Sequence, residues 1–158
     1  MSTVVSFSVP PVTKVVRVAC DREQAFERFT RDIHRWWPLR THSMYNEKAT
    51  GVTFEPGVGG RILERNGAGE EAQWGSVTAW EPPQRVEFSW HVGRGPENAQ
   101  TVEVTFLPCP EGTEVRLVHS GWEALAERDA PMRDEYDRGW GHVFVECYAD
   151  YCRINPSG

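Results

Sequence analysis

The sequence predicts an α+β fold in which a strongly curved antiparallel sheet wraps around one long C-terminal helix. Three observations support this class. A β-branched segment is followed by two short helical segments, and between residues 50 and 120 there are short segments in which apolar and polar residues alternate. The chain then ends in a helix with one aromatic face. Sequential strands joined by tight turns form antiparallel meanders. A helix with one aromatic face needs a sheet on which to bury it. A sheet of about six or seven strands curled around that helix would leave a cavity between the two.

The composition is that of a globular domain. Of the 158 residues, 39% are hydrophobic and 25% are charged, and 7 are Trp and 7 are Phe. This excludes disordered, collagen-like and coiled-coil chains. The formal net charge of −6 excludes a basic nucleic-acid surface, and no apolar run approaches the ~18 residues of a membrane span. We expect one domain over residues 1–158, with its core at about 12–153.

The N-terminal part is expected to form one strand and two short helices. Residues 12–18 are rich in β-branched side chains and alternate as a strand does. Asp21 has the position of an N-cap, with a glutamine three residues later as in a capping box. The second short helix carries the Trp36-Trp37 pair and should stop at Pro38, because proline disfavours helical backbone in the residue before it.

The middle of the chain is predicted to be a meander. Its expected strands cover residues 50–55, 60–65, 71–80, 86–91, 102–106 and 114–119. The Asn66-Gly67 pair between two of them is a strong hairpin signal. The glycines at 57–60 join two strands, so no helix N-terminus follows them to receive a phosphate. We therefore interpret them as a turn.

The C-terminal part is predicted to be helical, first over residues 122–128 and then from Pro131 onward. Gly139 and Gly141 each cost about 1 kcal/mol inside a helix, and close packing of the Trp140 segment on a sheet would explain them. The apolar residues of the second helix recur at three- and four-residue spacing, which places them on one face. They are Tyr136, Trp140, Val143, Phe144, Cys147, Tyr148 and Tyr151.

Several stretches together resemble a known family. They are residues 20–26, Arg35-Trp36-Trp37-Pro38, Gly75-Ser76-Val77 with Glu81-Pro82-Pro83, residues 86–90, residues 112–115 leading to 119–122, and Gly139-Trp140. In this order and spacing they resemble the SRPBCC (START/Bet v 1-like) superfamily, and within it the relatives of the activator of Hsp90 ATPase homologue. The resemblance covers about residues 12–153. It implies a helix-grip fold with a hydrophobic cavity between sheet and helix, in a superfamily of lipid binders, cyclases and co-chaperone domains.

Aromatic residues are the most informative candidates for a binding site. Trp74, Trp80 and Trp122 belong to the same aromatic set, and any single ring could equally serve plain core packing. The residues that we expect to line a ligand cavity, from inward strand positions or the helix face, are Trp36, Trp37, Tyr45, Phe54, Phe88, Trp90, Phe106, His119, Trp140, Phe144 and Tyr148.

We assign no catalytic residue from the sequence, and His119 is the candidate that comes closest. Alternation with Val115 and Leu117 points it inward, either as a proton-transfer group or as a core histidine satisfied by a neighbour. His142 and Glu146 lie one helical turn apart, which is more typical of a solvated face than of a metal site. We predict no metal and no cofactor.

The leading functional hypothesis is a binding protein for a small hydrophobic or aromatic molecule. One alternative is a cyclase- or hydrolase-like enzyme using His119 with Tyr45 or Tyr148 as acid–base groups. Another is a co-chaperone-type interaction module. The sequence leaves a homodimer open. Four cysteines without a C-x-x-C pattern, and no recognisable targeting signal, favour reduced thiols and a cytoplasmic location.

Overall fold

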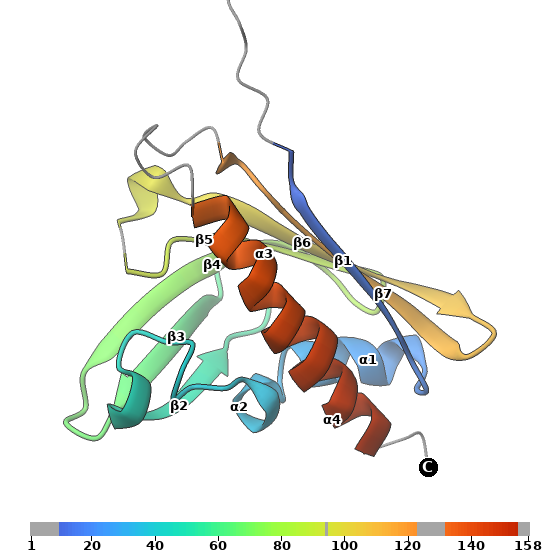
Figure 1. Cartoon of the computed structure of the whole chain (residues 1–158), viewed down its shortest axis with the longest axis horizontal. Coiled ribbons are helices and arrows are strands. Elements are labelled where there is room, and N and C mark those ends of the chain that lie inside the picture. Colours follow the sequence, from blue (N-terminus) through green and yellow to red (C-terminus); the bar gives the residue numbers. More distant parts are fainter. Residues whose placement is uncertain (1–9, 94, 123–131, 155–158) are drawn as a thin grey trace, which may run out of the picture.

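The computed structural model describes residues 10–93, 95–122 and 132–154. Within them, seven strands form one antiparallel sheet in the order β1-β7-β6-β5-β4-β3-β2, and the C-terminal helix crosses its concave side (Figure 1). The predicted α+β class and helix-grip arrangement are confirmed. The strands are β1 (Val12–Val18), β2 (Ala49–Phe54), β3 (Arg61–Asn66), β4 (Glu71–Glu81), β5 (Arg85–Trp90), β6 (Gln100–Cys109) and β7 (Gly112–Ser120).

Both predicted short helices are present after β1. In α1 (Arg22–Phe29), the Asp21 carboxylate accepts a hydrogen bond from the Gln24 backbone N–H at 2.8 Å, as the N-cap interpretation requires. Helix α2 (Ile33–Trp36) ends where Trp37 takes an extended backbone, with φ −68° and ψ 128°, directly before Pro38. Because the helix stops there, the Trp37 indole lies beyond the end of α2.

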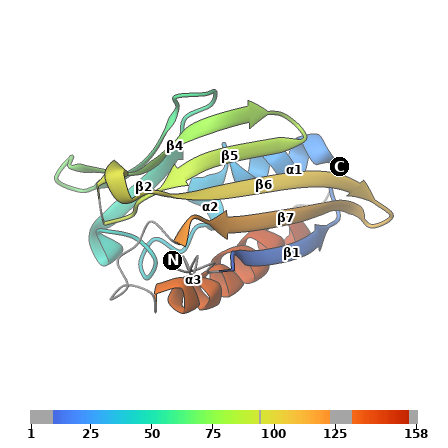
Figure 2. The same ribbon diagram turned by 90° about the horizontal axis from the view of Figure 1, so that it is seen from above.

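The sheet buries alternate residues and curls along its length. Seen from above, strands β4, β5, β6, β7 and β1 lie side by side (Figure 2). The register shifts between Ile62 and Leu63 in β3 and between Val77 and Ala79 in β4. Such irregularities bend a strand and increase its twist. Strand β6 extends two residues further toward the N-terminus than the predicted 102–106 segment and three further toward the C-terminus, because both ends still pair with neighbouring strands.

Close approach of two strands explains one glycine of the family-like motif. A Cβ on Gly75 in β4 would overlap the carbonyl oxygen of Ser89 in β5. The hairpin predicted at Asn66 is confirmed, with a longer turn than a two-residue loop. The Asn66 side-chain oxygen accepts from the backbone N–H groups of Ala68 and Glu70, both at 3.0 Å.

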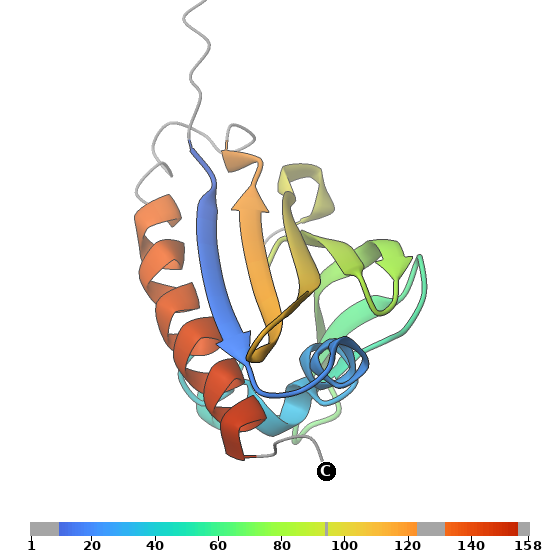
Figure 3. The same cartoon turned by 90° about the vertical axis from the view of Figure 1, so that its right-hand side faces the viewer.

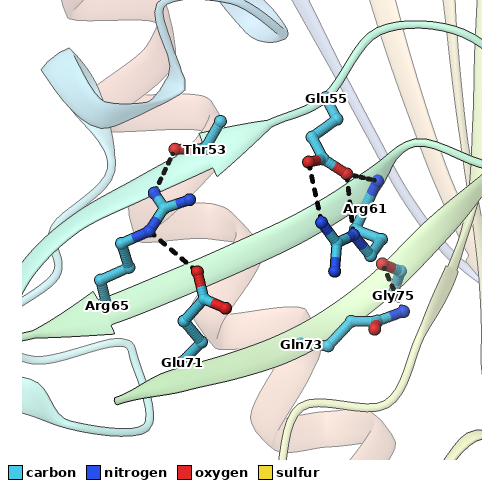
Figure 4. Close-up of polar contacts among 7 residues, drawn as sticks. All are labelled: Thr53, Glu55, Arg61, Arg65, Glu71, Gln73 and Gly75. Atoms are coloured by element: carbon cyan, nitrogen blue, oxygen red, sulfur yellow. Dashed lines mark hydrogen bonds and ion pairs between the residues drawn. The ribbon is translucent and has the colours of Figure 1, made fainter. Parts of the chain in front are cut away.

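Ion pairs occupy the exposed positions of strands β2 to β4 (Figure 4). Arg61 meets Glu55 at 3.0 Å, and Arg65 meets Glu71 at 3.0 Å and the Thr53 hydroxyl at 2.8 Å. Exposed pairs of this kind contribute little to stability. The stability of this part of the sheet therefore depends chiefly on its buried apolar residues, such as Val52, Phe54, Ile62 and Trp74.

The C-terminal helix runs along β1 (Figure 3). It consists of α3 (Met132–Trp140), the π-helical η5 (Gly141–Tyr148) and α4 (Ala149–Ile154). The predicted long C-terminal helix is confirmed, and its middle is π-helical from Gly141 onward, which shifts the side-chain period. Cys152 is consequently fully buried, whereas Cys147 and Tyr151 of the predicted apolar face are only half-buried. The predicted 122–128 helix lies, beyond Trp122, outside the described residues.

Short 3₁₀ turns, η1 (Asn46–Lys48) and η2 (Pro96–Asn98), precede β2 and β6. All four cysteines are free thiols, and Cys20 and Cys152 are buried. No helix in the described part of the chain is long and apolar enough to cross a membrane.

Candidate functional site

A cavity of about 290 Å³ lies between the concave face of the sheet and the C-terminal helix. Its buried walls come from the sheet, from the helix and from the end of α2. The exposed or half-buried residues 41–43 and Asn46, from the segment between α2 and β2, form its open side. The lining residues are Trp37, Thr41, His42, Ser43, Asn46, Trp74, Trp90, Val92, Tyr136, Gly139, Trp140 and Val143.

Four tryptophans form the walls of this cavity. The ring centroids of Trp37 and Trp74 lie 4.9 Å apart, and those of Trp37 and Trp140 lie 5.7 Å apart. Trp90 is 5.6 Å from Trp74 and 5.5 Å from Trp140. Mutual contacts between the rings, in tilted and edge-to-face arrangements, fix their orientation. The wall is therefore largely pre-formed.

Three of the four indoles are also held by hydrogen bonds. Each N–H donates to a protein acceptor: Trp37 to the His42 carbonyl at 2.7 Å, Trp74 to the Glu64 carboxylate at 2.9 Å, and Trp140 to His119 Nδ1 at 2.9 Å.

Glu64 anchors the open side of the cavity and was missed from the sequence. It is fully buried in β3. Besides Trp74, its carboxylate accepts from the backbone N–H groups of Met44 at 2.8 Å and Tyr45 at 2.9 Å. A buried charge needs such partners. The available signal was its position two residues after the inward Ile62, where alternation predicts another inward side chain.

His119 is a buried neutral residue behind the cavity wall. Because an indole N–H can only donate, the bond from Trp140 requires an unprotonated Nδ1 and places the proton on Nε2. That nitrogen lies 3.4 Å from the Gln100 side-chain oxygen. Burial lowers the pKa of His119 to about 3. Its geometry favours the core-histidine interpretation, in which it positions Trp140, over proton transfer to a ligand.

The other predicted site residues fall into separate places. Trp37, Trp90 and Trp140 line the cavity. Tyr45 lines a separate, open depression formed by residues of the 40–48 segment. Phe54 lines a second apolar pocket of about 300 Å³ with Phe26 and Trp80. The remaining aromatic residues, which pack around Phe29 of α1 directly or through a neighbouring ring, are Trp36, Phe88, Phe106, Phe144 and Tyr148.

The single converging space expected from the sequence is therefore divided. Helix α1 inserts Phe29 between the sheet and the C-terminal helix, and aromatic rings from both pack around it. Trp36 donates its N–H to the Arg28 carbonyl at 2.7 Å, and Tyr148 donates its hydroxyl to the Ala25 carbonyl at 2.7 Å. Both side chains thus face α1 rather than the cavity. The alternation of apolar and polar residues in the sequence does not show how closely a short helix packs against the concave face of a sheet.

Two histidines meet at the open side. The rings of His42 and His142 lie 5.2 Å apart, and His42 Nδ1 is 2.7 Å from the Thr41 hydroxyl. Burial, and then His142, lowers the pKa of His42. His142 and Glu146 form the exposed pair expected of a solvated face, at 3.1 Å. No group of three metal-ligating side chains occurs among the described residues.

Comparison with solved structures identifies similar folds. The anthrahydroquino-gamma-pyrone synthase Txn09 is 29% identical over 90% of this chain and 97% of its own, with a TM-score of 0.58. An AHSA1-like protein from Aeromonas hydrophila is 18% identical over 89% of this chain and 90% of its own, with a TM-score of 0.62. Protein MLL2253 from Mesorhizobium loti is 19% identical over 87% of this chain and 93% of its own, with a TM-score of 0.61. The last two similarities show the fold alone.

No curated protein sequence matches the chain significantly. A family model described as "Activator of Hsp90 ATPase homolog 1-like protein" matches residues 19–146, which is most of the chain. That match includes α1, the strands β2 to β7, and the helical segment that forms one wall of the cavity. The chain therefore belongs to the family of activator of Hsp90 ATPase homolog 1-like proteins.

Proposed function

We propose that the protein binds a compact, mostly apolar aromatic molecule in the tryptophan-lined cavity. The observation that carries this proposal is the set of four indoles around about 290 Å³ of space. Small-molecule sites typically measure about 300–1,000 Å³, so this volume favours a compact ligand over a long acyl chain. Flat indole walls favour a planar ring system, which can stack on them or meet them edge to face.

Gly139 supports the proposal. It lies in α3, lines the cavity, and an added Cβ would meet no heavy atom within 4 Å. Close packing of the helix on the sheet therefore does not require a glycine here, contrary to the sequence expectation. Glycine inside a helix costs about 1 kcal/mol relative to alanine. The absence of a side chain at Gly139 leaves the cavity open at this position.

The proposal is tested by direct detection of a ligand. A native mass spectrum of freshly purified protein should show a co-purified small molecule, or the emptied protein should bind members of a panel of aromatic compounds. Because tryptophans form the walls, binding should change tryptophan fluorescence saturably. Absence of saturable binding across lipids, aromatics and polyketide-like compounds would contradict the proposal.

A second candidate is an enzyme that acts on such a molecule. The 29% identity to a synthase over nearly the whole of both chains favours it. His119 and Tyr148 do not line the cavity, and burial raises the pKa of Tyr148 well above its usual range. Among the described lining residues, the titratable side chains are His42 and Tyr136. His42 has the lowered pKa of a neutral base, which suits it to accept a proton.

The enzyme and the carrier are separated by one variant. His42→Gln keeps a polar side chain of similar size and removes the base. An enzyme that uses His42 would lose turnover of a bound aromatic substrate and keep its affinity. A carrier shows no turnover in either form.

A further inference from the structure

The middle of the C-terminal helix brings a thiol, an imidazole and a carboxylate together. In an α-helix, which turns about every 3.6 residues, side chains five positions apart point to different faces. Residues 141–148 are π-helical, with hydrogen bonds that span five residues rather than four. This wider turn places Cys147 Sγ 3.8 Å from His142 Nε2, and His142 Nδ1 lies 3.1 Å from Glu146 Oε1.

The contacts of His142 determine which of its nitrogens carries the proton. An ionised carboxylate only accepts hydrogen bonds, so the contact with Glu146 places the proton of the neutral ring on Nδ1. The lone pair is then on Nε2, beside the Cys147 thiol. A nucleophile next to a base, with the base oriented by a third group, is the arrangement by which proteins activate thiols and hydroxyls.

The Cys147 thiol needs such a base. Burial, and then Glu146 and Asp150, raise the pKa of Cys147, so the sulfur carries its proton at neutral pH. Only the thiolate is the nucleophile. Cys147 is half-buried and His142 is exposed, which leaves the pair accessible from solvent. A reaction at this sulfur therefore requires transfer of its proton to His142.

The surroundings of the thiol favour an addition over acyl transfer. Acyl transfer forms an oxyanion on the attacked carbon, which needs donors around it. Backbone N–H groups inside a helix are already bonded to its carbonyls, and the charges that act on Cys147 are the carboxylates of Glu146 and Asp150. Conjugate addition to an α,β-unsaturated carbonyl instead places the charge on an oxygen three bonds from the attacked carbon, where water can solvate it.

We propose that Cys147 is a covalent modification site for small α,β-unsaturated carbonyl compounds, with His142 as its base. The sulfur forms a bond to the β-carbon as the C=C π bond breaks. The thiol proton passes to His142 Nε2 and then to the α-carbon, so no leaving group or oxidant is involved. Glu146 is a positioning residue for the imidazole. The inference does not depend on the proposed function, because Cys147 is not among the residues that line the cavity.

The test uses 2-cyclohexen-1-one as the acceptor, with the rate at each cysteine of the folded protein followed by peptide mass spectrometry. Cys109 is the internal reference: it is also half-buried and lies beside a carboxylate, that of Glu111, but contacts no histidine among the described residues. Cys147 should react at least about tenfold faster than Cys109, because general-base assistance typically gives about 10²–10⁴-fold. The preference should disappear in protein unfolded by urea. Equal rates in the folded protein would overturn the inference.

Two variants separate the base from its positioning residue. His142→Gln, at an exposed position, should keep the melting temperature and the Cys109 rate and lower the Cys147 rate to that of Cys109 or below. An unchanged Cys147 rate would overturn the inference. Glu146→Ala removes a negative charge near the thiol, which by itself would lower the pKa of Cys147 and speed the reaction. A positioning role predicts a slower reaction instead, and a faster one would overturn that role.

Discussion

The concave face of the sheet is filled around Phe29 of α1 in one half and hollow between the four tryptophans in the other, although both halves are built from aromatic residues. In the filled half, the Phe29 ring of α1 lies between the sheet and the helix, with Phe106, Phe144 and Tyr148 around it. In the hollow half no side chain of the described residues takes the corresponding place, and the helix presents Gly139. Aromatic content alone therefore does not distinguish a core from a binding site. What distinguishes them here is whether a neighbouring element inserts a side chain.

The largest effect is expected from removing the element that both halves share. A chain that ends at Met132 loses the buried side chains of the C-terminal helix, each of which contributes about 1.5–3 kcal/mol when large. Total stabilities are about 5–15 kcal/mol. The truncated chain should show no cooperative melt and no native near-UV circular dichroism. A cooperative, native-like transition would contradict the role assigned to the helix.

The two halves should respond differently to a large-to-small substitution. Phe29→Ala should lower the free energy of unfolding by about 3–5 kcal/mol, and the protein that remains folded should keep its affinity for cavity probes. Trp140→Ala should lower both stability and affinity. Urea denaturation and probe titration on each variant make the comparison. Loss of probe binding in a folded Phe29→Ala protein would contradict the separation of the Phe29 core from the cavity.

Glu64 is expected to hold the open side of the hollow half. Glu64→Gln leaves one acceptor oxygen for three donors, which should cost about 1.5–3 kcal/mol. Hydrogen exchange should accelerate at the Met44 and Tyr45 amides. The exposed Glu47→Gln in the same segment is the control and should change neither quantity. Unchanged exchange at the two amides in Glu64→Gln would rule out the anchoring role.

His119 should make stability depend on pH. Its pKa is lowered from 6.5 to about 3 by burial, so between these values the unfolded chain binds a proton that the folded chain does not. Stability is therefore unaffected by this residue above pH 6.5 and falls as the pH drops, by about 2 kcal/mol between pH 7 and 5. His119→Gln should remove that loss from urea denaturation curves. The exposed His34→Gln should retain it, and identical curves for both variants would contradict the buried neutral state.

Much of the fold could be predicted from local sequence. The Asp21 cap, the stop at Pro38 and the Asn66 hairpin each depend on one residue and its neighbours, and alternation located the strands. The site could be predicted less well. Trp37, Trp90 and Trp140 were expected in the cavity, but Trp36 turned out to face α1, and this depends on the depth at which a short helix packs.

Other parts of the site depend on contacts between distant segments. The anchoring by Glu64 joins β3 to residues that lie about twenty positions earlier. The π-helical segment changes the side-chain period in a way that a 3.6-residue repeat does not anticipate. Trp74 entered the aromatic set without a place in the cavity, because its role follows from its bond to Glu64.

The central claim, that the hollow half is a ligand site kept open by Gly139, is tested most directly by filling it. Gly139→Leu should occlude the cavity and abolish binding of aromatic probes such as 1-indanone and indane, while the melting temperature stays the same or rises, since leucine favours the helix by up to about 1 kcal/mol. Gly141→Leu is the matched control, because Gly141 also has no heavy atom within 4 Å of an added Cβ but does not line the cavity. The account predicts lost binding in the first variant and retained binding in the second. Full affinity in a folded Gly139→Leu protein would contradict it.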